Sequence, residues 1–328
     1  MDPVPPVVRA ALAAASDSPG YPQTQGTERL RAAAANWLHR SHGVSVDPGA
    51  VLPVIGTKEF IAWLPTLLGC GPDDTVVYPE LAYPTYRIGA LLAGARAVAA
   101  DGMLAVGPGR VRLVWVNSPA NPTGRVLPAG HLAKMASWAR ERGTVLASDE
   151  CYIDLTYTEP SLSVLHPDVC GGSHRGLLAV FSLSKRSNLA GYRAGFVTGD
   201  PDLAGQLLEI HRHAGMIMPA PVQAAMTAAL DDDEHALEQR ARYAARRETL
   251  AAALRAAGWQ TDHSAAGLYL WASHPGHDDW GSVDVMAGAG ILVAPGSFYG
   301  AAGARHIRVA LTATDERVNS AATRLAAL

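Results

Sequence analysis

Short apolar runs recur through the first two-thirds of this chain, and a helical pattern follows most of them. Residues 111–116 and 177–181 are almost continuously apolar. A strand that is apolar on both faces is typical of a parallel sheet with helices packed on each side. The alternation therefore predicts an α/β fold with a mostly parallel central sheet, and further strands at 51–55, 75–78, 144–147 and 194–198.

The character of the chain changes at four consecutive acidic residues, 231–234. Acidic side chains stabilise the start of a helix, so a long charged helix is expected from here through residue 255. Strand patterns follow at 268–271, 291–294 and 306–311, with helices near 282–287 and after Thr314. We therefore expect a large domain over residues 21–230 and a smaller α+β domain over residues 231–328.

The composition excludes several classes of protein. The 328 residues carry a net charge of −3, which gives no electrostatic reason to bind nucleic acid or an anionic membrane. No apolar run reaches the roughly 20 residues that span a bilayer, and the first residues do not resemble a signal peptide. Cys70, Cys151 and Cys170 form no C-x-x-C pair, and the histidines show no H-E-x-x-H spacing. We expect a cytoplasmic protein without a metal site.

Polar residues gather directly after the apolar run at 177–181, where Ser182, Lys185 and Arg193 follow one another. Open α/β sheets bind ligands at the carboxyl ends of their strands. A partly desolvated lysine can lose its proton and attack a carbonyl carbon, while hydroxyls and a guanidinium suit a phosphate. Together these groups suggest pyridoxal phosphate, an aldehyde that carries a phosphate. Taken alone, the pattern also fits a solvated surface lysine.

Three further motifs fall at strand ends of the same predicted sheet. They are Gly56-Thr57-Lys58, Asn121-Pro122-Thr123-Gly124 and Asp149-Glu150-Cys151-Tyr152. Each has a plain interpretation by itself, as a helix start, a loop or a chance pair. Because the carboxyl ends of parallel strands meet at one edge of a sheet, the four motifs together predict a single site.

This set of motifs resembles the class I/II aminotransferases, which are fold-type I pyridoxal phosphate enzymes. The resemblance rests on N-P-T-G, S-D-E-x-Y and S-x-S-K-x-x-x-x-x-G-x-R-x-G, and it extends from Tyr21 to the end of the chain. Residues 54–65 and 213–221 look like the actinobacterial N-succinyldiaminopimelate aminotransferases of lysine biosynthesis. The resemblance implies a fold-type I transferase with a smaller α+β domain.

The resemblance assigns roles to individual residues. Lys185 would bond to the cofactor aldehyde and carry the proton at the substrate α-carbon. Asp149 would keep the pyridine nitrogen protonated, because a cationic ring accepts electrons from that carbon. Tyr152 and Asn121 would hydrogen-bond the phenolic oxygen of the cofactor, and Tyr83 would stack on its ring.

The same resemblance implies where the anionic groups bind. Gly56 would allow close approach to the cofactor phosphate, which would be held by Thr57, Lys58, Ser182 and Arg193. Tyr21 would reach the phosphate in a neighbouring subunit, which implies a homodimer with shared active sites. Arg308, together with Asn121, would bind the substrate α-carboxylate through a pair of parallel hydrogen bonds.

Nothing in the family pattern identifies the pocket for the substrate side chain. Arg87, Arg186 and His213 are candidates, and the plain interpretation of each is a surface charge. Lys58 would serve either the phosphate or the substrate. The family usually begins with a further segment that closes over the substrate, so we expect a truncated start, with residues 1–20 packing against the small domain.

The expected activity is transfer of an amino group between glutamate and an oxo acid by ping-pong exchange. The favoured substrate is N-succinyl-LL-2,6-diaminopimelate. A broad-specificity aminotransferase or a C–S β-lyase on the same fold would carry the same motifs. A non-catalytic relic that binds pyridoxal phosphate is a further alternative. The presence of all the catalytic residues argues against it. A nucleic-acid regulator would need a helix-turn-helix or a basic patch, and neither is visible.

Overall fold

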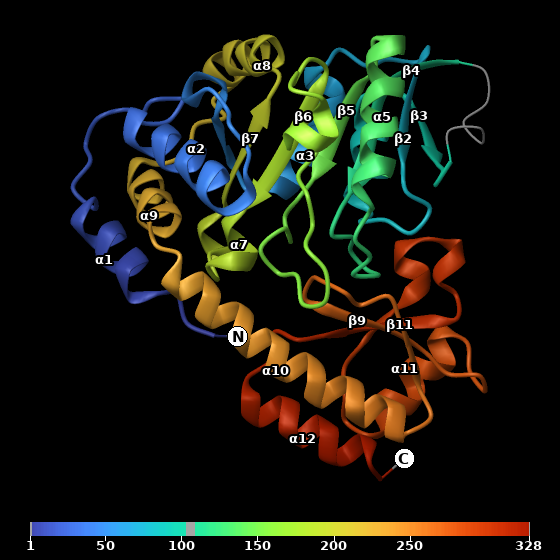
Figure 1. The fold of residues 1–328 in the computed structure, drawn as a ribbon. Coiled ribbons are helices and arrows are strands. Elements are labelled where there is room, and N and C mark those ends of the chain that lie inside the picture. Colours follow the sequence, from blue (N-terminus) through green and yellow to red (C-terminus); the bar gives the residue numbers. More distant parts are fainter. Residues whose placement is uncertain (1, 103–108, 328) are drawn as a thin grey trace.

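The computed structural model describes residues 2–102 and 109–327. Its larger sheet has seven strands in the order β1-β7-β6-β5-β4-β2-β3 (Figure 1). The strands are β1 (Leu52–Ile55), β2 (Asp74–Tyr78), β3 (Arg96–Ala99), β4 (Arg110–Asn117), β5 (Val145–Asp149), β6 (Leu177–Ser182) and β7 (Ala194–Gly199). The five strands from β3 to β6 in this order are parallel, and β7 runs antiparallel to both of its neighbours. The predicted mostly parallel α/β sheet is confirmed.

Apolar cores cover both faces of this sheet, which explains the continuous apolar runs. In β4, Val114 and Val116 belong to one core, whereas Leu113 and Trp115 belong to the other. The first core packs against α2 (Glu28–His42), α5 (Ala129–Arg142) and α9 (Ala220–Asp231). The second packs against α3 (Thr57–Leu67), α4 (Thr85–Leu92) and α8 (Pro201–Ala214). The short helix α6 (Pro167–Cys170) packs beside α5.

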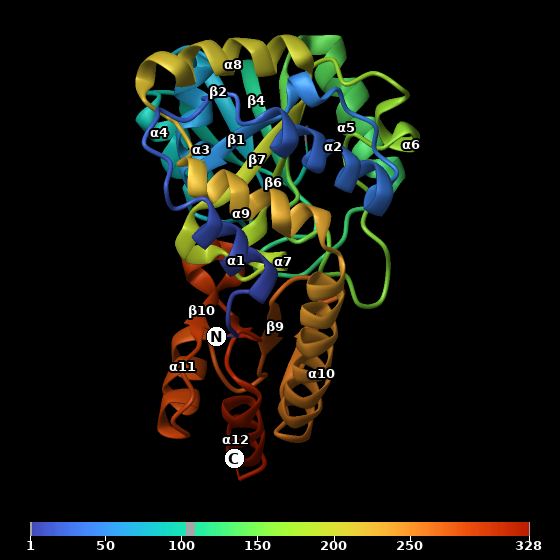
Figure 2. The ribbon, with the colours of Figure 1, turned by 90° about the vertical axis from the view of Figure 1, so that its left-hand side faces the viewer.

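A second sheet lies apart from the first, with three helices of the C-terminal region around it (Figures 1 and 2). It is antiparallel, in the order β10-β11-β9-β8. Its elements are β8 (Gln260–Asp262), β9 (Tyr269–Ser273), β10 (Ala294–Pro295), β11 (His306–Ala310), α10 (Glu234–Ala256), α11 (Asp279–Gly288) and α12 (Asp315–Leu325). We propose that residues 231–328 form the smaller domain and residues 21–230 the larger one; residues 1, 103–108 and 328 lie outside the described residues.

The N-terminal segment contacts both parts of the molecule. Helix α1 (Pro6–Ala14) lies beside α9, and Val8 is buried in the core that α9 shares with the large sheet. The Asp2 carboxylate binds the guanidinium of Arg246 on α10 at 2.7 Å. The segment therefore links α9 to α10 (Figure 2).

Two short strands were not predicted. Strand β3 is at the edge of the large sheet, and both Arg96 and Ala99 are exposed, so its sequence carries no strong apolar pattern. Strand β8 spans three residues with little burial. The strand predicted at 291–294 begins too early, because only Ala294 and Pro295 pair with β11. Among the helices of the described residues, none has the length and apolar character to cross a membrane.

Candidate active site

A cavity of about 410 Å³ opens where β4, β5 and β6 end, and side chains from the second sheet close its other side. Ten of the predicted residues line it, namely Thr57, Lys58, Tyr83, Asn121, Asp149, Tyr152, Ser182, Lys185, Arg193 and Arg308. Gly56 borders it through contact with Arg193. A larger groove of about 610 Å³ between α10 and α12 contains none of the predicted residues. The sequence motifs therefore meet at one place, as the strand order requires.

The two neighbouring acids at the end of β5 face opposite ways. Asp149 lines the cavity, and its Oδ1 accepts a hydrogen bond from the backbone N–H of Cys151 at 3.1 Å. Glu150 is buried on the other side, where its Oε1 accepts from the N–H of Val164 at 2.7 Å. Burial raises the pKa of Glu150 to about 7. The residue alternation of a strand thus leaves Asp149 as the carboxylate that can meet a ligand.

Tyr86, which the sequence analysis missed, fixes Asp149. Its hydroxyl donates to Asp149 Oδ2 at 2.7 Å, and its ring stacks on Trp115 with centroids 5.1 Å apart. Tyr86 is fully buried, and burial followed by the nearby Asp149 charge raises the pKa of its hydroxyl. The hydroxyl therefore stays protonated and remains a donor. No motif signals this contact, since Tyr86 lies 63 residues before Asp149.

Lys185 lies in α7 (Leu183–Arg186), a single turn that starts directly after β6. The Ser182 hydroxyl caps this turn by accepting from the N–H of Ser184 at 3.3 Å. The Lys185 Nζ lies 5.8 Å from the centre of the Tyr152 ring. Tyr152 donates to the Tyr269 hydroxyl at 3.4 Å, and burial raises its pKa, so the phenol is neutral at ordinary pH.

The amino end of α3 forms an anion-binding corner with Arg193. Gly56 caps α3 with a left-handed φ of 76°, and a Cβ at this position would overlap the guanidinium of Arg193. The first N–H groups of an α-helix have no partners within the helix and point toward its amino end. Glycine is needed here both for the backbone angle and for the space that Arg193 fills.

Arg308 is held on the opposite wall by two aromatic rings. Its guanidinium carbon lies 3.7 Å from the Tyr269 ring centre and 4.8 Å from that of Tyr299. Its Nη1 donates to Asn121 Oδ1 at 2.9 Å. Its Nε is buried and has no hydrogen-bond partner among the described residues. A flat guanidinium fixed in this way presents an unfilled donor to a carboxylate.

The structure separates the remaining candidates. Arg87 and His213 are exposed, as the plain interpretation of each predicts, and neither lines the cavity. The surface interpretation of Arg186 is wrong, because this side chain is only 4% exposed and binds Asp154. Tyr21 is fully exposed and does not line the cavity. The aromatic wall of Tyr269, Phe298 and Tyr299 was missed, because nothing in the sequence places these residues next to the strand ends.

The family model for aminotransferases of class I and II matches residues 1–325. The chain belongs to this family. These enzymes are fold-type I aminotransferases that use pyridoxal phosphate, so the predicted enzyme class, fold and cofactor are confirmed.

Several relatives of this aminotransferase are known. It is 58% identical over 325 residues to 4-dedimethylamino-4-oxo-anhydrotetracycline transaminase OxyQ of Streptomyces rimosus, covering 99% of this chain and 90% of that protein. It is 59% identical to the probable aminotransferase Rv1178 of Mycobacterium tuberculosis, covering 99% and 78% respectively. A probable N-succinyldiaminopimelate aminotransferase from Thermus thermophilus has a solved structure with 30% identity and a TM-score of 0.90, covering 99% of this chain and 92% of that one.

The cavity of this aminotransferase fits pyridoxal phosphate. Its lining includes the buried carboxylate of Asp149 and the amine of Lys185. Arg193 occupies the space that a side chain at Gly56 would fill, next to the amino end of α3. The cationic groups Lys58, Lys185, Arg193 and Arg308 outnumber the carboxylates in the lining, which suits a ligand with several negative charges.

We expect Gly56→Ala to weaken the binding of pyridoxal phosphate about 10- to 100-fold. This is the usual contribution of hydrogen bonds between a charged group, here Arg193, and its ligand. The new Cβ displaces the Arg193 guanidinium from the corner. Gly69→Ala is the matched control, because Gly69 also has a left-handed φ, of 69°, but faces open space. Titration of the cofactor-free protein with pyridoxal phosphate measures both. Equal losses in the two variants would contradict a role for Arg193 at the phosphate.

Proposed function

We propose that this aminotransferase transfers the amino group of glutamate to N-succinyl-2-amino-6-oxopimelate, which yields N-succinyl-LL-2,6-diaminopimelate for lysine and diaminopimelate biosynthesis. The observation that carries this proposal is the presence of two cations, Arg308 and Lys58, beyond those that the cofactor needs. Two separate cations suit a substrate with a second carboxylate.

Several residues of the cavity have proposed tasks toward the cofactor. Pyridoxal phosphate, when bound, supplies a protonated ring that accepts the electrons left at the substrate α-carbon. Lys185 would hold the cofactor and move the proton at that carbon through its Nζ. Asp149 would keep the ring nitrogen protonated. Tyr152 and Asn121 would donate to the phenolic oxygen, and Tyr83 would lie against the ring.

The phosphate would lie at the amino end of α3. Gly56 leaves space there, and Thr57, Ser182 and Arg193 supply polar groups around it. Backbone N–H groups at the start of the helix add to these donors. Lys58 lies in the same turn, and we assign it to the substrate rather than to the phosphate, which Thr57, Ser182 and Arg193 would hold.

Lys58 is the residue that we assign to the second carboxylate. It is exposed, lies 5.8 Å from the Tyr83 ring centre, and has no ion pair within residues 2–102 and 109–327. A cation in the first turn of a helix is disfavoured by the helix dipole, so an anion beside it would be stabilising. The Thermus neighbour, named for N-succinyldiaminopimelate, and LL-diaminopimelate aminotransferases 30–32% identical to this chain support a substrate of this class.

A homodimer with shared active sites agrees with two exposed features. Tyr21 has no covering side chain, although tyrosine usually buries part of its ring. Trp63 on α3 and Ile88, Leu91 and Leu92 on α4 are between 40% and 56% exposed, and these helices pack side by side.

The three cysteines are free, as is expected in the cytoplasm.

A polycyclic aromatic ketone is a second candidate for the amino acceptor. Tyr83, Tyr269, Phe298 and Tyr299 give the cavity an aromatic wall. The 58% identical OxyQ is named for a transaminase reaction on an anhydrotetracycline ketone. A broad-specificity aminotransferase or a C–S β-lyase uses the same groups around the cofactor, so the acceptor must be tested directly.

Arg308→Ala is expected to raise the KM for glutamate about 10- to 100-fold, because it removes charged hydrogen bonds to the α-carboxylate. The dissociation constant of pyridoxal phosphate should change by less than about twofold, since Arg308 belongs to β11 of the second sheet whereas the phosphate corner is at the start of α3. Arg305→Ala, at an exposed residue of the same segment, serves as the control. An equal loss of cofactor and glutamate binding would mean that Arg308 only supports the structure.

A substrate panel tests the acceptor. Glutamate formation from 2-oxoglutarate should be fastest with N-succinyl-LL-2,6-diaminopimelate, and slower with L-alanine or L-phenylalanine. Lys58→Met should lower kcat/KM about 10- to 100-fold for the succinylated donor and by less than about threefold for L-alanine, which has no second carboxylate. Preference for an aromatic donor, with no effect of Lys58→Met, would support the polycyclic ketone instead.

A further inference from the structure

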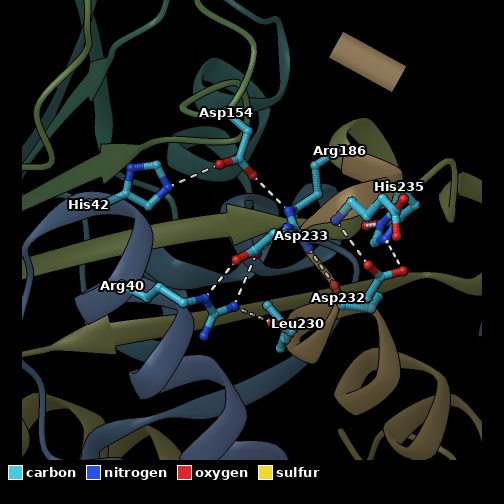
Figure 3. Close-up of polar contacts among 11 residues, drawn as sticks. Arg40, His42, Asp154, Arg186, Leu230, Asp232, Asp233 and His235 are labelled. Carbon is cyan, nitrogen blue, oxygen red and sulfur yellow. Dashed lines mark hydrogen bonds and ion pairs between the residues drawn. The ribbon is translucent and has the colours of Figure 1, made fainter. Parts of the chain in front are cut away.

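Arg186 directly follows Lys185, and its side chain binds the junction between α9 and α10. Its Nη1 donates to the backbone oxygen of Ala229 at 2.6 Å, and its Nε donates to Asp154 at 2.8 Å. Its Nη2 pairs with Asp233 at 3.5 Å (Figure 3). Two carboxylates therefore balance this buried cation, and His42 donates to Asp154 from the other side.

Ser187 and Asn188 continue the same attachment. The buried Ser187 hydroxyl is hydrogen-bonded to His235 Nε2 at 2.8 Å, and His235 Nδ1 contacts Asp232 at 3.1 Å. Asn188 donates to Gln239 at 3.0 Å and accepts from the hydroxyl of Tyr243 at 3.1 Å. Three consecutive residues after Lys185 thus bind a single stretch of chain around the start of α10.

The partners on α10 form one stripe. His235, Gln239 and Tyr243 are spaced four residues apart, so they lie on the same face of the helix. Burial lowers the pKa of His235, which keeps the ring neutral. Because the Asp232 carboxylate can only accept, Nδ1 carries the proton and Nε2 accepts from Ser187. We call Arg186, Ser187 and Asn188 with these partners the α10 bracket.

We propose that Arg186, Ser187 and Asn188 are positioning residues, which hold the Lys185 amine at its working place through the α10 bracket. Helix α7 spans only one turn, and so short a helix is not stable by itself. On the other side of Lys185, the strand pairing of Ser182 with Gly195 already fixes the chain. The α10 bracket fixes the chain on the C-terminal side of Lys185. None of the three residues lines the cavity, so they act only through Lys185.

The inference rests on the proposed role of Lys185 as the residue that bonds to the cofactor. A catalytic group displaced by about 1 Å loses up to about 100-fold in rate, even when the change lies outside the site. Loosening the bracket should therefore lower kcat while leaving substrate binding nearly unchanged. It should also let the cofactor leave faster, because the lysine that retains it is less well placed.

Two variants and one control test the proposal. Arg186→Met removes the guanidinium, and Asn188→Gly removes the amide while tolerating the φ of 56° at this position. Arg40→Met is the matched control, because Arg40 binds the same Asp233 at 2.6 Å but has no bond to residues 185–188 (Figure 3). Each holoenzyme is assayed with L-glutamate for kcat and KM, for the release rate of pyridoxal phosphate, and for its urea midpoint.

Both variants should lose about 10- to 100-fold in kcat with KM for glutamate changed less than about twofold, and both should release the cofactor faster. Arg40→Met should keep kcat and release at the wild-type values. Lower urea midpoints with wild-type kcat and release would overturn the proposal. If Arg186→Met does not fold, Asn188→Gly decides by the same readouts. Lys185→Ala is measured in parallel: if it still retains the cofactor covalently, the proposed role of Lys185 has failed instead.

Discussion

The buried Asp149 carboxylate at the end of β5 is the constraint on which the site depends. A carboxylate that is 5% exposed is expensive to bury unless hydrogen bonds or a cation offset the loss of water. The fold supplies a neutral phenol from Tyr86 and a backbone N–H, but no cation bonds to this carboxylate among the described residues. A ligand with a protonated ring nitrogen would complete the balance. The parallel strands bring this carboxylate to the same edge as Asn117, Ser182 and Lys185.

The cavity is assembled from two parts of the chain, so its shape depends on how these parts are joined. The large sheet contributes the strand ends, and the second sheet contributes Tyr269 and Arg308. The contact between Arg308 and Asn121 bridges them directly. Helix α10 joins the two parts a second time through the α10 bracket, and Asp2 extends that join by binding Arg246. Helix α10 therefore contacts both the second sheet and the chain directly after Lys185.

The sequence predicted the site best at the ends of strands, where several polar residues follow an apolar run. Apolar runs that stop at Asn117, Asp149 and Ser182 predicted both the sheet and the edge where ligands bind, because parallel strands share that edge. Tyr86 and Tyr269 were missed, because their partners are 63 and 117 residues away and only packing brings them together. Arg186 was read wrongly for the same reason: an arginine after a lysine looks solvated until Asp154 and Asp233 are placed around it.

The most direct measurement identifies which amine binds the cofactor. The chain has three lysines, Lys58, Lys134 and Lys185, and two of them line the cavity. Borohydride reduction of the holoenzyme makes the bond to pyridoxal phosphate permanent, and peptide mapping by mass spectrometry then locates it. We predict that the cofactor mass will be found on the peptide that contains Lys185 and on no other peptide. The same mass on Lys58, or on no lysine, would contradict a site built around Lys185 and Asp149.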